Sequence, residues 1–241
     1  ADQADGIDFV VGTLPLGTVT FLPNQPSRTI IIQVNGDVDV EATEGFTVTL
    51  SNPSAPATIL TATAVGQIIN EDSAFAISAI DSNKAEGNLG NTPYTFTVRR
   101  TGDLSVAATV EYTVTGSGFD LANPADFDGG TMPANVVLTF DPDVTNQDIT
   151  INVNGDAVIE PDEGFTVTLG TVVGPATVTT SSANGLIVND EFPTVTLASD
   201  LATILETGGK AVVTATLSER AYTNVVIDFV YTGTAVSGGE D

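Results

Sequence analysis

Acidic side chains recur at fixed spacing in two stretches of the chain, residues 34–50 and 153–169. Each stretch begins with Val-Asn-Gly-Asp, has acids at the first, fifth and eighth positions counted from that Asp, and continues as Phe-Thr-Val-Thr-Leu. The acids are Asp37, Glu41 and Glu44 in one stretch and Asp156, Glu160 and Glu163 in the other. Clustered carboxylates repel one another, and a hard divalent cation relieves the repulsion by taking their oxygens as ligands. The pattern therefore indicates a cation site, and calcium tolerates irregular loop geometry better than magnesium does.

The composition narrows the chemistry further. The 241 residues include 31 acids against 6 bases, a formal net charge of −25, and neither cysteine nor histidine. Disulfides, thiolate or imidazole metal ligands, cysteine nucleophiles and Ser-His-Asp triads are therefore excluded. Nucleic acids are not expected as partners, because binding them relies on basic contacts to phosphate and this chain is strongly acidic. No apolar run has the length of a membrane span, so we expect no membrane insertion.

Catalysis by carboxylates alone is the remaining enzymatic hypothesis. A pair of carboxylates can hydrolyse glycosides, and Glu160 with Glu163 is such a pair. The chain has no Trp and only 4 Tyr, which leaves no aromatic platform for a sugar. We therefore expect that the protein is not an enzyme.

The acidic stretch belongs to a longer repeat. A shift of 119 residues, the separation of Phe46 from Phe165, also relates residues 69–72 to residues 188–191. A further partial copy follows Pro193. The expected organisation is the later part of one repeat (1–72), a complete repeat (73–191) and the early part of another (192–241). The junctions have almost no linker, so neighbouring repeats should sit end to end with little freedom.

The complete repeat reads as an antiparallel β-sandwich. Short alternating runs rich in Val, Ile and Thr, separated by Gly, Pro, Asn and Asp, are typical of that fold. The expected strands are 75–80, 94–99, 109–114, 136–140, 149–153, 164–169 and 183–188. No stretch has a helical apolar period. Because a sandwich gathers its loops at two ends, Glu86, Asp126, Asp190 and Glu191 are expected to join Asp156, Glu160 and Glu163. The alternative for each acid is an ordinary turn residue or a solvated surface.

These motifs resemble those of the Calx-beta family. The resemblance rests on Asn-Gly-Asp-x-x-x-Glu-x-x-Glu-x-Phe-x-Val-x-Leu followed by Ile-x-Asn and two acids, with Glu86-Gly87, residues 94–102 and Asp126-Phe127 also matching. It implies tandem immunoglobulin-like sandwiches with calcium at one end. The implied ligands are Glu86, Asp126, Asp156, the carbonyl of Val158, Glu160, Glu163, Asp190 and Glu191 in the complete repeat, Asp8, Asp37, Glu41, Glu44, Glu71 and Asp72 before it, and Glu206 after it. Asn189-Asp190-Glu191 replaces a fuller run of aspartates, which implies fewer ions or weaker binding.

The function expected from these features is structural. We expect a calcium-binding segment of an extracellular repeat array or filament, at the cell surface or secreted, in which calcium stiffens the domain junctions. The expected partners are neighbouring repeats or copies of the same chain joined head to tail by strand complementation. Either the natural protein continues past both ends, or neighbouring chains complete the partial repeats. The alternative is a calcium-dependent adhesive or regulatory binding module.

Overall fold

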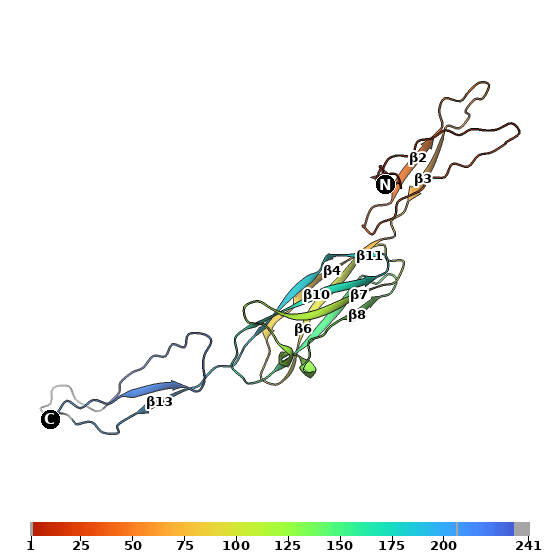
Figure 1. The fold of residues 1–241 in the computed structure, drawn as a ribbon. Helices are drawn as coiled ribbons and strands as arrows, with labels where there is room; N and C mark the ends of the chain where they lie inside the picture. Colours follow the sequence, from red (N-terminus) through yellow and green to blue (C-terminus); the bar gives the residue numbers. More distant parts are fainter. Residues whose placement is uncertain (1, 206, 234–241) are drawn as a thin grey trace.

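The computed structural model describes residues 2–205 and 207–233. A two-sheet sandwich occupies the middle of this part of the chain, and shorter β-structures extend from its two ends (Figure 1). The strands of the sandwich are β4 (Ser73–Asp81), β5 (Asn83–Ala85), β6 (Gly90–Gly102), β7 (Ala108–Ser117), β8 (Val136–Phe140), β9 (Asn146–Gly155), β10 (Glu163–Val173), β11 (Ala176–Thr180) and β12 (Ser182–Val188). Between β7 and β8 lie the 3-10 turns η1 (Pro124–Asp126) and η2 (Asp128–Gly130).

The two sheets of the sandwich have the orders β5-β12-β10-β7-β8 and β11-β4-β6-β9. Their facing sides are apolar because alternate residues of each strand point to the same side. On β10, Phe165, Val167 and Leu169 are buried while the intervening threonines face outwards. The expected all-β sandwich is confirmed, and each of the seven expected strands lies within an observed strand.

Phe165 lies at the centre of an aromatic cluster in the core. Its ring packs edge-on against Tyr94, Phe96 and Phe127 at centroid distances of 5.7, 5.9 and 5.5 Å. Gly185 is its partner on β12, and a Cβ there would overlap the Phe165 ring. The cluster therefore depends on glycine at that position and joins both sheets beneath one end of the sandwich.

Three details differ from the sequence-based expectation. The edge pairs β11–β4 and β12–β5 are parallel, although every other pair in the sandwich is antiparallel. The β12–β5 pair arises because the chain changes sheets at Ser82, whose carbonyl accepts from the Leu186 N–H at 2.8 Å, so that β5 becomes an edge strand of one sheet while β4 lies in the other, between β11 and β6. Strands β5 and β11 were not expected, since neither shows a long apolar alternation. The 3-10 turns η1 and η2 were not expected either, and at three residues each they are too short to show a helical apolar period.

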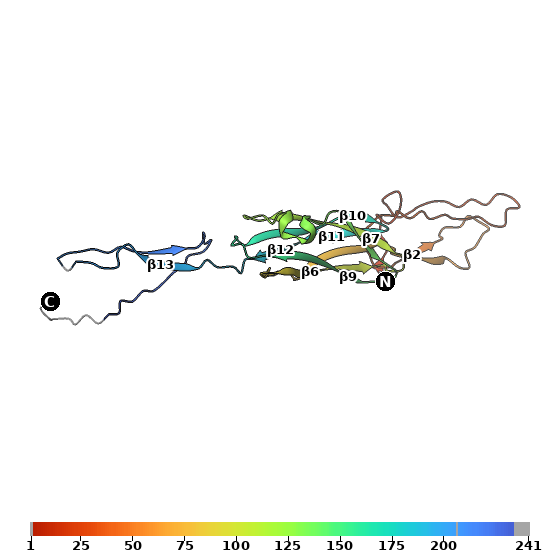
Figure 2. The same cartoon turned by 90° about the horizontal axis from the view of Figure 1, so that it is seen from below.

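The flanking structures are smaller and more open. On the N-terminal side lie β1 (Asp2–Gln3), β2 (Glu44–Thr49) and β3 (Thr63–Ile68), which form a sheet of order β1-β2-β3. On the C-terminal side β13 (Val195–Ser199) and β14 (Val213–Leu217) form an antiparallel pair. Figure 2 shows that these structures extend from opposite ends of the sandwich. In the described part of the chain, no helix has the length and apolar character needed to cross a bilayer.

Candidate metal centre

Three carboxylates converge at the end of the sandwich that faces β13. One oxygen from each of Asp126, Glu160 and Glu163 lies within 4.8 Å of the other two. Asp126 ends η1, Glu163 begins β10, and Glu160 lies in the turn between β9 and β10. Residues that are far apart in the chain are thus brought to one point by the strand ends.

Asp126 is held in place by a small capping network. The Asn123 N–H donates to Asp126 Oδ2 at 2.5 Å, and the Asn123 side chain accepts from the Ala125 N–H at 3.0 Å. Pro124 opens the 3-10 turn, where its lack of an N–H costs nothing. This reciprocal capping box leaves the Asp126 carboxylate buried and turned towards β10.

The turn after β9 is held by two side-chain acceptors. The Val158 N–H donates to Asp156 Oδ1 at 2.7 Å, which closes a local turn around the exposed Asp156. The Glu160 N–H donates to Asn189 Oδ1 at 2.9 Å, and Asn189 Nδ2 donates to the Glu191 carbonyl at 2.8 Å. Asn189 therefore ties the acidic turn to the junction that follows β12.

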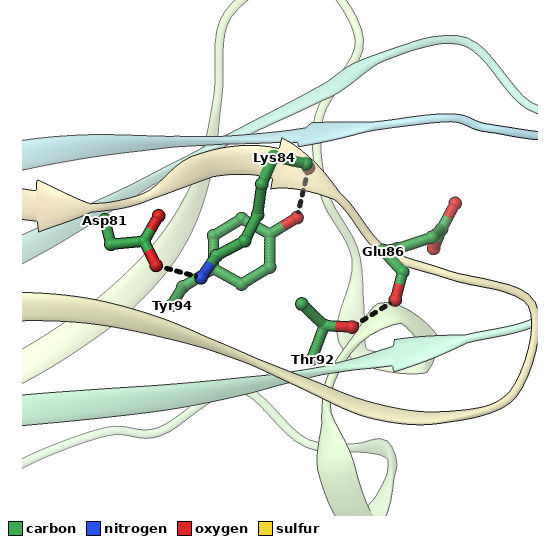
Figure 3. A network of polar contacts seen from close by, with 5 residues as sticks. All are labelled: Asp81, Lys84, Glu86, Thr92 and Tyr94. Atoms are coloured by element: carbon green, nitrogen blue, oxygen red, sulfur yellow. Dashed lines mark hydrogen bonds and ion pairs between the residues drawn. The ribbon is translucent and has the colours of Figure 1, made fainter.

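Glu86 is positioned by the polar network shown in Figure 3. The Tyr94 hydroxyl donates to the Lys84 carbonyl at 2.6 Å, and the Thr92 hydroxyl donates to the Glu86 carbonyl. Lys84 Nζ contacts Asp81 Oδ2 at 2.5 Å and lies over the Tyr94 ring. These contacts hold β5 against the sandwich and leave the Glu86 carboxylate free of them, at only 4% exposure.

The two acids that follow β12, Asp190 and Glu191, make different contacts. Asp190 Oδ1 accepts from the Gly87 N–H at 3.0 Å, so this carboxylate supports the Glu86 loop. Glu191 is 8% exposed, and its Oε1 accepts from Asn88 Nδ2 at 2.5 Å. Its Oε2 is buried without a hydrogen-bond partner. Such an oxygen is costly to bury and indicates a missing donor or cation.

The electrostatics of the site oppose full ionisation. Burial, reinforced by the charges of Asp156 and Glu191, raises the pKa of Glu86 to about 8. Burial and a hydrogen bond with Asp126 raise the pKa of Glu163 to about 8. The pKa of Glu160 is raised as well, by burial and then by Asp156. Among the described residues the one ion pair is Lys84–Asp81, so no basic side chain neutralises these acids.

The donor set suits a hard cation. Every polar ligand in reach is oxygen, which favours calcium or magnesium over transition metals. Oxygens bound to one calcium ion at about 2.3–2.6 Å lie no more than about 5 Å apart, and one oxygen from each of Asp126, Glu160 and Glu163 lies within 4.8 Å of the others. The unpartnered Glu191 oxygen adds an acceptor at the junction. The residues therefore fit calcium, and their assignment as ligands remains a prediction, as does that of the Val158 carbonyl.

The acids of residues 2–72 repeat the local geometry without the same convergence. Asn70 accepts from the Glu41 N–H at 2.9 Å and donates to the Asp72 carbonyl at 2.9 Å, as Asn189 does in the sandwich. Burial is the main cause that raises the pKa values of Glu41, Glu44 and Asp72, and the charge of a neighbouring acid is the second cause in each case. That neighbour is Asp37 for Glu41, Asp8 for Glu44 and Glu71 for Asp72. In the described residues, a three-carboxylate grouping occurs in the sandwich alone. Glu206 lies outside the described residues.

Sequence reasoning missed three asparagines that organise the site. Asn189 was read as a replacement for an aspartate ligand, whereas its amide bridges two backbone groups. Asn88 holds Glu191, and Asn154 Nδ2 donates to the carbonyls of Ala125 and Phe127. The recurrence of Asn70 and Asn189 at the 119-residue shift was the available signal. An amide at that position can donate and accept, which a carboxylate cannot.

Replacing Asn189 by alanine is expected to destabilise the protein by about 1–3 kcal/mol, because the Glu160 N–H and the Glu191 carbonyl lose their partners. Urea unfolding measures the loss. The control is Asn146→Ala, since Asn146 is exposed and its side chain donates only to the adjacent Thr145 hydroxyl. Equal stability of the two variants would contradict the bridging role of Asn189.

Comparison with known proteins supplies the family. The family model of the Calx-beta domain matches residues 4–74 and 71–191. A crystal structure titled as the apo form of the Calx CBD1 domain is 25% identical, covering 49% of this chain and 98% of its own, with a TM-score of 0.41. A structure of CBD12 from CALX1.2 is 27% identical, with 48% and 45% covered and a TM-score of 0.40. The calcium binding domain CBD12 of CALX1.1 is 19% identical, with 58% and 69% covered and a TM-score of 0.41. Because the family model matches most of the chain, the protein belongs to the Calx-beta family.

Proposed function

We propose that the acidic end of the β4–β12 sandwich binds calcium and that the ion stiffens the junction with the repeat that follows. The observation that carries this proposal is the convergence of Asp126, Glu160 and Glu163 within 4.8 Å, with no base beside them. Membership of a family whose solved relatives include a structure titled as a calcium binding domain supports the choice of ion. The role is binding rather than catalysis.

The junctions support the structural part of the proposal. Glu191, with its unpartnered oxygen, is followed at once by the segment that leads to β13. At the other junction the Asp72 carbonyl accepts from Asn70 Nδ2 and from the Asp103 N–H, both at 2.9 Å. A Cβ on Gly102 would meet the Val40 side chain, so the acidic stretch that precedes β2 and the end of β6 already lie close together. Fixing the acids at these places would restrict the hinge between repeats.

The setting that fits this role is extracellular, in a surface or secreted array. Extracellular calcium modules work with dissociation constants of about 10⁻⁴–10⁻³ M, which suits a site assembled from loop carboxylates. The large negative charge keeps such a rod soluble and separated from others of its kind. In this setting calcium would act as a permanent structural ion.

Calorimetric titration with calcium tests the site. The wild-type chain should bind calcium in the range of about 10⁻⁴–10⁻³ M. The double variant Asp126→Asn, Glu163→Gln should bind at least about tenfold more weakly, equal to ~1.4 kcal/mol, because two charged ligands become neutral. The matched control is Asp141→Asn, an exposed acid just beyond β8 at the opposite end of the sandwich.

Two results would overturn the proposal. The first is a wild-type chain that releases no heat with calcium at any concentration in that range. The second is a double variant that binds as tightly as Asp141→Asn does. Stiffening is tested separately by small-angle X-ray scattering, where calcium should lengthen the maximum dimension and narrow its distribution. If calcium binds but the scattering does not change, the calcium site would stand and the proposed stiffening of the junction would be contradicted.

A further inference from the structure

The first and last strands of the sandwich are joined directly by its two parallel pairs. β4 and β5 are the first strands of the sandwich along the chain, and β11 and β12 are the last. β11 pairs with β4 from Ala176↔Ser73 onwards, and β12 pairs with β5 up to Val188↔Ala85. We call these two pairs the parallel clamp. The other strand pairs of the sandwich are antiparallel, so the parallel clamp is a distinct part of the fold.

Tension along the chain pulls the two sides of the parallel clamp in opposite directions. The chain enters the sandwich at Ser73 and leaves it after Val188, at the two opposite ends from which the flanking structures extend (Figures 1 and 2). Because the paired strands run in the same direction, a pull on Ser73 draws β4 and β5 towards the N-terminal flank. A pull on Val188 draws β12, and β11 behind it, towards β13. The clamp is therefore loaded in shear, along the axes of its strands.

Shear is the direction in which paired strands resist force most strongly. When two strands are pulled along their axes, their hydrogen bonds share the load and must break together. When an edge strand is pulled sideways, its bonds break one after another. Parallel strands are bonded at even spacing, which spreads a shear load over the whole pair. Because forced unfolding is governed by the unfolding rate, the rupture of the clamp is the barrier that such tension must cross.

The residue at which the chain enters the sandwich is bonded to the last strands. The Ser73 N–H and the Ser73 hydroxyl both donate to the Pro175 carbonyl, at 3.0 and 3.1 Å. Further along the same pair, the Thr179 hydroxyl donates to the Phe75 carbonyl at 3.2 Å. Ser73 is fully buried, so water does not compete for these bonds. The β11–β4 side of the clamp is thus fastened where tension enters.

Ser82 fastens the other side of the clamp just before β5 begins. Its hydroxyl donates to the Asn184 carbonyl at 3.0 Å, and its carbonyl accepts from the Leu186 N–H at 2.8 Å. The side chain is only 8% exposed. Both bonds connect the chain between β4 and β5 to β12, so a shear displacement of β5 against β12 stretches them together.

Two more hydrogen bonds continue the clamp beyond the end of β5. The Gly87 N–H donates to Asp190 Oδ1 at 3.0 Å, and Asn88 Nδ2 donates to Glu191 Oε1 at 2.5 Å. Asp190 and Glu191 come directly after β12, so these bonds tie the outgoing chain to the loop that follows β5. The exit of the chain is thus bonded to the first strands, as its entry is bonded to the last.

We propose that the β4–β12 sandwich is a load-bearing module, in which the parallel clamp carries tension that arrives through the segments before Ser73 and after Val188. The partners that transmit this tension are the flanking repeats of the same chain. The strand pairs of the clamp do not include Asp126, Glu160 or Glu163, so the function goes beyond ion binding and does not depend on it.

The direction of pulling tests the parallel clamp. The chain has no cysteine, so pairs of introduced cysteines define where optical tweezers apply force. Ile69→Cys with Phe192→Cys, at exposed positions before β4 and after β12, loads the clamp in shear. Val106→Cys with Asp141→Cys, at exposed positions beside the ends of β7 and β8, peels the edge strand β8 sideways. In chelator and at one loading rate, the first pair should require the higher unfolding force. An equal or lower force overturns the proposal.

Single side chains locate the barrier. Ser82→Ala removes the hydroxyl bond to Asn184, and under constant tension between positions 69 and 192 its unfolding rate should rise about fivefold, as when ~1 kcal/mol is lost from the barrier. The matched control is Thr97→Val, which removes a hydroxyl bond to Asp148 between β6 and β9. Neither of those strands continues into a flanking segment, so the control should unfold at the wild-type rate.

A second clamp variant, Asn88→Ala, removes the bond to Glu191 from an exposed loop position that tolerates substitution. It should also unfold faster than wild type under the same tension. Urea unfolding in chelator gives the equilibrium stability of each variant, which separates a faster rupture from a general loss of stability. If Thr97→Val accelerates as much as Ser82→Ala, or if neither clamp variant differs from wild type, the parallel clamp does not carry the load. Since every measurement is made in chelator, a failure of calcium binding leaves this result unchanged.

Discussion

Without calcium, the thermal unfolding midpoint of the β4–β12 sandwich is expected to fall as the pH rises from about 4.5 to about 8. The folded state raises the pKa of Glu86 and of Glu163 from 4.5 to about 8, chiefly through burial. In this window the folded state therefore binds more protons than the unfolded state, and stability declines as those protons are lost. Above pH about 8 both carboxylates are ionised and the decline should level off.

Calcium is expected to reverse this dependence. The ion binds the ionised carboxylates, so its affinity should increase over the same pH range in which the calcium-free protein weakens. At a hundredfold excess over the dissociation constant, binding to the native state alone stabilises by about 2.7 kcal/mol. Circular dichroism melts in calcium and in chelator, repeated across the pH range, measure both effects.

Two variants separate the site from general charge repulsion. Glu86→Gln keeps the side-chain size and removes one of the two carboxyls whose pKa is raised to about 8, so its midpoint in chelator should depend less on pH. Asp141→Asn removes an exposed acid at the opposite end and should keep the wild-type dependence. A midpoint in chelator that rises with pH through this window would contradict the assignment of raised pKa values to the site.

Replacing Phe165 by alanine is expected to cost about 3–5 kcal/mol of stability, a large share of the roughly 5–15 kcal/mol that an ordinary domain has. Phe165 is fully buried on β10 and contacts two aromatic rings of β6 in the facing sheet and the Phe127 ring in the loop that carries Asp126. Because β10 begins at Glu163, the cavity would also loosen the base of the acidic end. Urea unfolding followed by circular dichroism gives the free energy.

Phe119→Ala is the matched control, because it deletes the same atoms from a side chain that is 99% exposed. A surface change of this kind should alter stability by no more than about 0.5 kcal/mol. If the two variants lost the same stability, the cluster around Phe165 would not be the centre of the core. Calcium binding by Phe165→Ala at low temperature, where the variant is folded, should be weakened.

Features that depend on neighbouring residues were predicted correctly from the sequence. The alternation in Phe165, Val167 and Leu169 placed β10 and its buried face, and the other six expected strands followed in the same way. The 119-residue repeat anticipated matched local geometry, which is seen in the amide bridges of Asn70 and Asn189. Such features are encoded locally because side-chain direction and turn closure depend on residues a few positions apart.

Features that depend on edges and loops were not predicted. Strand β5 has three residues, so its pairing with β12 follows from the sheet change at Ser82 and not from its own composition. The turn η1 does have a local signal in Asn123-Pro124, an N-cap residue followed by proline at the first helical position. Parallel edge pairing has no local signature, because it joins segments that are about a hundred residues apart.

By itself, the sequence determined the family, the all-β sandwich and the set of acids that are candidate calcium ligands. Only the tertiary structure decided that Asp126, Glu160 and Glu163 share one point, that Asp190 instead supports Gly87, and that one oxygen of Glu191 is buried without a partner. The spacing of acids along the chain records which residues share a turn. Which turns share an end, and how much water remains around each carboxylate, depends on strands paired across the whole fold.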